Sequence, residues 1–225
     1  AKMRNTKESI LEAQFTSGAG NWCTWMFGRD LVNWNNNFTW AKWVTPSRDL
    51  ISAFKQEGDE VRFKESIVYY DCNWSNYYPS DNYPFMYKCR SANSSIIKYR
   101  YADVLLLKAE ALIMQDTPDL EGAADIIDEV RDRAKLGALP TSVRSNKNVL
   151  LNALLKERRL ELAFEGQRWF DLVRLDKVEE VMNAVYAKDS GRKAQIYTFD
   201  KNSYRLPIPQ SVIDANDKIH QNPGY

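Results

Sequence analysis

Tryptophan and asparagine side chains gather between residues 17 and 49, and their chemistry suits a binding surface. Five of the seven tryptophans lie there, interleaved with asparagines. Indole faces can cover the flat C–H face of a ring, and asparagine amides both donate and accept hydrogen bonds. This combination favours an uncharged, polyhydroxylated ligand such as a sugar. The residues predicted to contact it are Trp22, Trp25, Trp34, Asn35, Asn36 and Trp40.

A second group of aromatic residues follows in the Tyr-, Asn- and Pro-rich stretch at 71–95. Tyr77 and Tyr78 are predicted to contact the same kind of ligand, with Tyr83 nearby. Packing of these rings around Pro79 and Pro84 is an equally good interpretation. The tryptophans have a similar alternative, because large aromatic side chains are mostly buried and could form a local core beneath their loop.

Catalytic and metal-binding patterns are weak in this sequence. Glycoside hydrolysis needs two facing carboxylates, and nothing in the spacing of the aspartates near the aromatic stretches pairs them. The single histidine, His220, lies near the C-terminus, and there is no CxxC motif, so neither a histidine-based triad nor a zinc site is predicted. A disulfide between Cys72 and Cys89 is possible, but spacing does not decide it. We predict a protein that is not an enzyme, has no cofactor and has no metal-ligand motif. Calcium stays open, because the scattered Asp and Asn residues form no loop of known ligand spacing.

The stretch from Glu157 to Arg174 combines charge with an apolar face. Read as one helix, it places Arg158, Glu161, Glu165 and Arg168 in a single stripe flanked by leucines. Unpaired charge is costly to bury, so the arginines at the ends are expected to offset the repulsion between the glutamates. The stripe is therefore interpreted as a structural ion ladder in a buried helix. Arginines beside the glutamates would lower the carboxyl pKa values, which makes poor general acids.

Two further residues of this stretch carry expectations of their own. Gly166 interrupts the pattern and is expected to let another backbone come close. Trp169 is expected to lie in the core.

Hydrophobic periodicity predicts a mainly helical chain with long irregular loops and a few short strands. Helices are expected from a Thr45 cap with Pro46 at the first position, over 100–114, from a Thr117 cap to Gly137, from Asn146 or Asn148 onward, and over 176–187. The pair around Thr117 forms a helical hairpin. Residues 7–16 are expected to form a short strand or a helical turn, and strands are expected within 61–70, 195–199 and 204–206.

Charge and length exclude some classes of function. The net charge is +1, with both signs interspersed, so no basic stripe for nucleic acid is expected. No apolar run approaches the length of a membrane-spanning helix. The N-terminal residues show neither a signal peptide nor a lipidation cysteine.

Five motifs in order carry a resemblance to a known family. They are RYADVLLLKAEA (100–111), EVRDRA (129–134), ERRLELAFEGQRWFDLVR (157–174), LPIP (206–209) and QNPGY (221–225). The chain resembles the C-terminal portion of the SusD/RagB family. The resemblance implies a TPR-like, helical-hairpin fold in one domain over 1–225. Residues 1–99 would then be the loop-rich ligand region, 100–190 the helical scaffold and 191–225 an extended tail.

The resemblance also implies a function. The family comprises lipoproteins of the Bacteroidetes outer-membrane surface, which bind polysaccharide or oligosaccharide without catalysis and work with a SusC-like, TonB-dependent transporter. Contact with the membrane would come only through a lipid anchor that this sequence lacks. Because family ligand residues lie on variable loops, none is carried over by motif. The alternative is a helical protein–protein interaction module that has no glycan ligand of its own.

Overall fold

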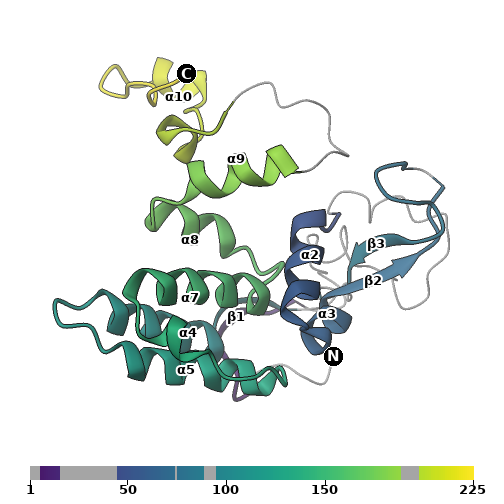
Figure 1. Cartoon of the computed structure of the whole chain (residues 1–225). Helices are drawn as coiled ribbons and strands as arrows, with labels where there is room; N and C mark the ends of the chain where they lie inside the picture. Colours follow the sequence, from purple (N-terminus) through teal and green to yellow (C-terminus); the bar gives the residue numbers. More distant parts are fainter. Residues whose placement is uncertain (1–5, 16–44, 74, 89–94, 189–197) are drawn as a thin grey trace. The chain divides into compact units, whose positions relative to one another are not determined.

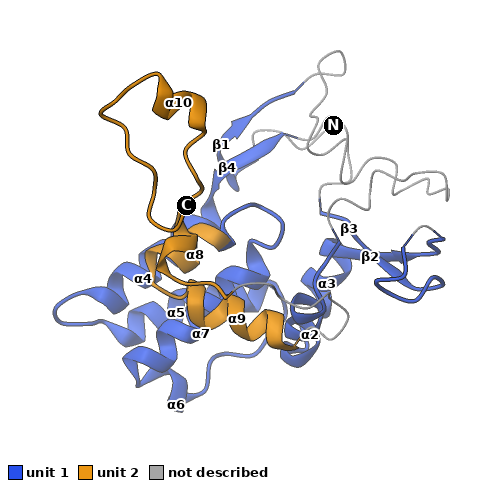
Figure 2. Cartoon of the chain, turned by 90° about the horizontal axis from the view of Figure 1, so that it is seen from above, with its two compact units in different colours: residues 1–168 blue, residues 169–225 orange. Residues whose placement is uncertain are grey.

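The computed structural model describes residues 6–15, 45–73, 75–88, 95–188 and 198–225. The chain divides into two compact units, residues 1–168 and residues 169–225 (Figure 2). Most of the tryptophan- and asparagine-rich stretch, at 16–44, lies outside the described residues. The single-domain organisation over 1–225 remains a prediction.

Three helices form the scaffold of the first unit (Figure 1): α4 (Tyr101–Met114), α5 (Leu120–Arg133) and α7 (Lys147–Glu161). α4 packs against both of the others, and the short α6 (Thr141–Arg144) joins α5 to α7. Their shared core consists of Leu106, Ala109, Ile113, Ala123, Ala124, Ile127, Val130, Leu150 and Leu154. The small alanines let the helices approach closely. The predicted helical hairpin is confirmed.

The hairpin's ends differ from expectation. Asp119, not Thr117, caps α5, because its carboxylate accepts a hydrogen bond from the backbone N–H of Gly122. The helix also ends before Gly137, with Lys135 in the left-handed region at φ 60°.

α7 begins as predicted and ends earlier than predicted. The side chain of Asn146 accepts hydrogen bonds from the first turn. The helix stops at Glu161, and Phe164 and Gly166 adopt positive φ angles of 65° and 81°. The single helix expected across 157–174 is therefore wrong. An added Cβ at Gly166 would meet nothing within 4 Å, so this glycine serves the left-handed turn and not a close backbone approach.

Two more helices and a hairpin of strands precede the scaffold. α2 (Arg48–Glu57) starts at the cap Ser47, not Thr45, and ends at Gly58 with φ 69°. α3 (Glu60–Ser66) occupies part of the stretch predicted as strand, and only β2 (Ile67–Tyr70) is extended. Asp59 caps α3, because its carboxylate accepts a hydrogen bond from the backbone N–H of Arg62. This cap favours a helix where the alternation of apolar and charged residues had predicted a strand.

The strands pair into two small sheets. β2 pairs antiparallel with β3 (Tyr83–Met86), so that Tyr70 lies opposite Tyr83. β1 (Ser9–Ala13), the strand alternative of the two expected within 7–16, pairs antiparallel with β4 (Ile96–Arg100). β4 runs directly into α4 and so connects the N-terminal segment with the scaffold.

The second unit contains α8 (Arg168–Arg174, which begins at the unit boundary), α9 (Val178–Lys188), the 3-10 helix η3 (Lys201–Tyr204) and α10 (Gln210–Asp214). α9 confirms the weak helix predicted over 176–187. The strand predicted over 204–206 is wrong, because Tyr204 ends η3, which Asp200 caps with a reciprocal capping box, and residues 205–206 are not in a strand. Of the strand predicted over 195–199, residues 195–197 lie outside the described residues, and 198–199 are not in a strand. Trp169 is half-buried and contacts the ring of Phe199, so its expected place deep in a core is wrong.

Among the residues that the structure describes, no helix has the length and apolar character needed to cross a membrane.

Candidate functional site

A buried network of ion pairs centres on the glutamates of α7. Glu161 is 4% exposed and accepts hydrogen bonds from Arg62 at 3.1 Å, Arg100 at 2.7 Å and Arg133. Glu157 accepts from Arg62 at 2.6 Å. Cations from α3, β4 and α5 therefore converge on one face of α7 and bind these elements to it.

The partners in this network are not those the helical spacing predicted. Glu165 pairs with Arg100 at 2.7 Å and with Lys88 at 2.5 Å. Arg158 pairs with Asp103 of α4 at 2.9 Å. Arg168 donates to the backbone oxygen of Leu155 at 3.1 Å. The charged stripe exists, but much of its neutralisation comes from cations distant in sequence.

These surroundings shift the pKa values of Glu161 and Glu157 in opposite directions. Burial alone would raise the pKa of Glu161, but Arg100 and Arg133 outweigh it and hold this pKa at about 2. Burial raises the pKa of Glu157 despite the opposing charge of Arg62. Glu161 therefore stays ionised at neutral pH and cannot donate a proton, which supports its interpretation as a structural group.

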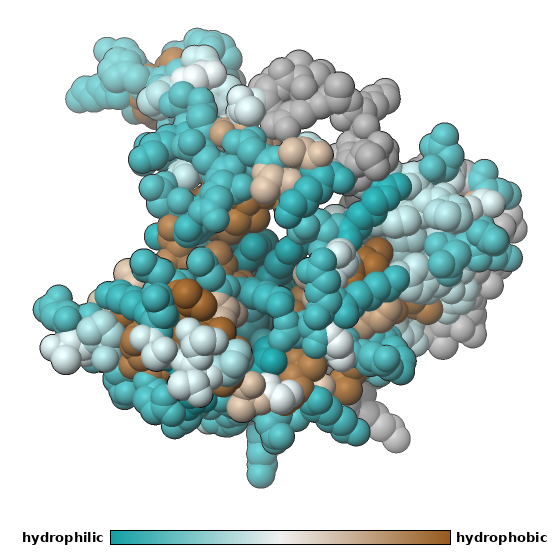
Figure 3. Space-filling model, in the orientation of Figure 1, coloured by the Kyte–Doolittle hydropathy of each residue, from teal (hydrophilic) through white to brown (hydrophobic). Residues whose placement is uncertain are grey.

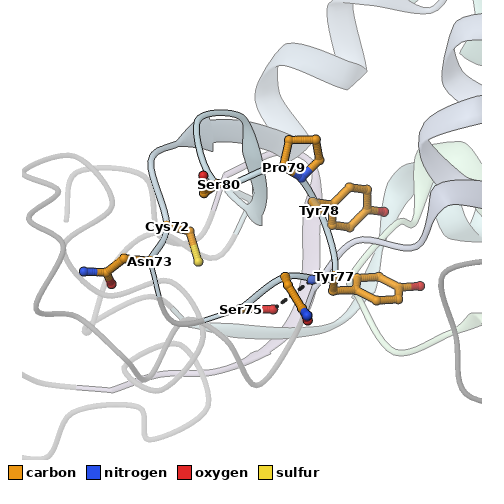
Figure 4. Close-up of a pocket in the computed structure, with 8 residues that line it drawn as sticks. Cys72, Asn73, Ser75, Tyr77, Tyr78, Pro79 and Ser80 are labelled. Carbon is orange, nitrogen blue, oxygen red and sulfur yellow. Dashed lines mark hydrogen bonds between the residues drawn. The ribbon is translucent and has the colours of Figure 1, made fainter.

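The loop between β2 and β3 encloses a hollow of about 830 Å³ (Figure 4). The described residues that line it are uncharged: Cys72, Asn73, Ser75, Asn76, Tyr77, Tyr78, Pro79 and Ser80. Cys72 is a buried free thiol whose side chain points into the space enclosed by the loop. Amide, hydroxyl and backbone groups of this kind recognise hydroxyl-rich ligands without needing charge.

The two predicted tyrosines lie together beside this hollow. The ring centroids of Tyr77 and Tyr78 are 5.0 Å apart in an edge-on arrangement. In Figure 4 both rings project in the same direction, away from Cys72. The hydroxyl of Tyr78 donates a hydrogen bond to the backbone oxygen of Pro46 at 2.7 Å. The ring centroids of Tyr78 and Tyr83 are 5.6 Å apart. Tyr83 itself is buried, so part of this group packs as the alternative interpretation expected.

Arg48 of α2 fixes the position of the tyrosine pair. Its guanidinium lies 4.0 Å from the ring centre of Tyr77 and 4.5 Å from that of Tyr78. It also donates to the backbone oxygen of Tyr77. Sequence reasoning missed Arg48, because 29 residues separate it from Tyr77 and no local pattern connects them. The cation therefore connects α2 to this loop and places positive charge beside the two rings.

The predicted site residues are thus only partly described. The structure brings Tyr77 and Tyr78 together at the hollow. The other predicted contacts, Trp22, Trp25, Trp34, Asn35, Asn36 and Trp40, lie outside the described residues. Their role in binding remains a prediction.

Comparison with known proteins gives one consistent result. The profile of the SusD family matches residues 81–225. SusD-like protein P38 of Formosa agariphila is 43% identical over 99 residues, which cover 41% of this chain and 19% of the relative. SusD-like protein P2 of the same species is 36% identical over 143 residues, which cover 60% of this chain and 27% of the relative.

Solved structures show the same fold. A SusD superfamily protein from Parabacteroides distasonis superposes with a TM-score of 0.73 at 23% identity, covering 97% of this chain and 50% of that one. A laminarin-binding SusD-like protein superposes with a TM-score of 0.62 at 25% identity, covering 99% of this chain and 51% of that one. The chain therefore spans about half of these solved proteins, and about a fifth to a quarter of the curated relatives lies within the matched segments.

Proposed function

Because this chain belongs to the SusD family, we propose that it binds a polysaccharide or oligosaccharide and does not cleave it. The observation that carries the proposal is the uncharged hollow at Cys72–Ser80, beside two tyrosines that Arg48 holds in place. A structurally similar protein is described as binding laminarin, a fact about that protein which supports glycan as the ligand class here.

Binding would use the two properties of the loop together. The amide of Asn76 and the hydroxyl of Ser80 line the hollow and can hydrogen-bond sugar hydroxyls, and the rings of Tyr77 and Tyr78 offer apolar surface to C–H faces. Such a surface needs no reacting group. The carboxylates of α7 are ion-paired in the scaffold, so they do not supply the acid and base that hydrolysis requires.

The place of this protein in the cell forms part of the proposal. We propose that it acts at the outer-membrane surface, held by a lipid anchor on the whole protein, and passes its glycan to a SusC-like TonB-dependent transporter. Family membership supports this assignment. Co-purification of the whole protein with an outer-membrane barrel is the expected result, and recovery of the protein alone from solubilised membranes would contradict it.

Affinity electrophoresis in gels that contain different polysaccharides tests glycan binding. We expect retardation by at least one polysaccharide, and weaker retardation for Tyr77→Ala. The tryptophan variants Trp22→Ala, Trp25→Ala, Trp34→Ala and Trp40→Ala test the predicted indole surface separately. Tyr225→Ala, an exposed tyrosine in the second unit, is the control for loss of a ring and should not change retardation. Unchanged retardation in every loop variant would remove these residues from the site.

A second candidate function, binding of another protein, has its own observation. α4 exposes apolar side chains along one face: Tyr101, Val104, Leu107 and Met114. Neighbouring Ile10 and Leu11 of β1 are exposed as well. On the face drawn in Figure 3, apolar residues lie among polar ones over the helical scaffold. Exposed apolar patches mark protein interfaces, and this one suits the apolar face of a helix.

Charge placed on that face distinguishes the two functions. Val104→Glu should abolish a protein interaction through α4 and leave glycan retardation unchanged. Loss of glycan retardation in Val104→Glu, with the fold intact by circular dichroism, would contradict the assignment of α4 to protein binding alone. Lys108→Gln, at an exposed position of the same helix, lowers the net charge by the same one unit and is the control.

A further inference from the structure

A second hollow lies beside the tyrosines, and its lining differs in charge from the first. It encloses about 360 Å³ and is lined by Arg48, Ile51, Ser52, Lys55, Gln56 and Tyr78. Five of these residues come from α2. Tyr78 lines both hollows, so a chain of sugar units that contacts one is within reach of the other.

The charged residues in this lining are Arg48 and Lys55, and both are cationic. The acidic residues of α2 have partners elsewhere: Asp49 pairs with Arg159 at 2.6 Å, and Glu57 pairs with Arg131 at 2.6 Å. Lys55 is exposed and has no ion-pair partner among the described residues. The charge of Lys55 is therefore not neutralised by a carboxylate of the described residues.

The remaining groups give the hollow a polar edge and an apolar floor. Gln56 donates to the hydroxyl of Ser52 at 3.1 Å, so two groups able to bond sugar hydroxyls are held one helical turn apart. Ile51 and the ring of Tyr78 supply apolar surface. Arg48 is held by its cation–π contacts, which fixes one positive charge before a ligand arrives.

We propose that this hollow binds an acidic group on the glycan, either the carboxylate of a uronic acid or a sulfate ester. Arg48 supplies a planar donor that matches either oxyanion, and Lys55 supplies a mobile charge at the rim. This inference rests on the proposed glycan-binding function and assigns its ligand a charge. It adds a subsite on α2 to the uncharged hollow of the loop.

Pairs of polysaccharides that differ only in charge test the proposal. Polygalacturonate and its fully methyl-esterified form test the carboxylate. A sulfated galactan and its desulfated form test the sulfate. Neutral laminarin in the same set of gels tests glycan binding as such. We expect the acidic member of one pair to bind about 10-fold more tightly at low salt, with the advantage declining as salt rises.

Charge reversal at the rim locates the effect. Lys55→Glu should weaken binding of the acidic member about 5- to 20-fold and leave the neutral member within about 2-fold, as expected for replacing an exposed ion pair with a repulsion. Lys108→Glu on α4 changes the net charge equally and should leave both members within about 2-fold. Arg48 is left intact because it also positions the tyrosines.

Each outcome has a definite consequence. Equal binding of both members in both pairs, with laminarin or a neutral member bound, overturns the acidic subsite and leaves the proposed function standing. Equal weakening by Lys55→Glu and Lys108→Glu assigns the effect to overall charge and also overturns the subsite. Failure of every polysaccharide to bind removes the proposed function and this inference together.

Discussion

Replacing Glu161 with glutamine removes the carboxylate that three arginines share, and we expect its effect to depend on pH. The pKa of Glu161 in the folded protein is about 2, below the ordinary value of 4.5. A lowered pKa means that ionised Glu161 stabilises the fold fully above about pH 5 and that this stabilisation declines as the pH falls toward 2.

The size of the effect follows from the difference between the two pKa values. The shift corresponds to about 3 kcal/mol in total, of which about 2 kcal/mol is lost between pH 7 and pH 3. At pH 7, Glu161→Gln leaves Arg62, Arg100 and Arg133 without their shared carboxylate, and breaking a buried pair costs about 3 to 5 kcal/mol. At pH 3, partial protonation of Glu161 has already removed about 2 kcal/mol of this stabilisation from the wild-type protein.

Urea unfolding of both proteins at pH 7 and pH 3, followed by far-ultraviolet circular dichroism, measures this difference. The gap in unfolding free energy between wild type and Glu161→Gln should shrink by about 2 kcal/mol at the lower pH. Glu129→Gln on α5 is the matched control, because Glu129 is exposed and has no ion pair among the described residues. A gap that stays constant across this pH range would refute the view that arginines hold Glu161 ionised.

Three further stability predictions test the scaffold in the same urea assay. Gly166→Ala should cost about 1 kcal/mol because of its positive φ, whereas Gly137→Ala, which meets nothing within 4 Å, should be near neutral. Ile113→Ala should cost about 2 to 5 kcal/mol, because Ile113 is fully buried. Met114→Ala should cost less than about 1 kcal/mol, because the neighbouring Met114 is 53% exposed. Asn146→Ala should cost about 1 kcal/mol through loss of the α7 cap. Equal effects within the glycine pair or the Ile113–Met114 pair, or no effect at Asn146, would contradict these assignments.

The helical scaffold could be predicted because its signals are local. Apolar residues repeat at helical spacing across 100–134, and Asn146 is a strong cap. The end of α7 could not be placed, because hydrophobic periodicity continues beyond Glu161. Gly166 signalled a break, but the left-handed conformation of Phe164 has no signature in sequence, since bulky residues rarely adopt it.

The ion-pair partners of the buried glutamates could not be predicted from residues nearby in the sequence. Helical spacing pointed to arginines three residues from the glutamates, whereas Arg62 and Arg100 lie 99 and 61 residues from Glu161. Arg48 and the tyrosine pair show the same difficulty at the candidate site. Residue type indicated that Tyr77 and Tyr78 could bind a ring, but only the fold shows that a cation covers part of their surface.

Native mass spectrometry of the protein after prolonged incubation with a defined oligosaccharide, chosen from a polysaccharide that retards it, tests binding and the absence of cleavage in one spectrum. We expect the mass of the protein plus one intact oligosaccharide, with no shorter saccharide in the mixture. Protein without adduct at millimolar oligosaccharide, or shortened saccharides that accumulate with time, would contradict a protein that captures glycan without altering it.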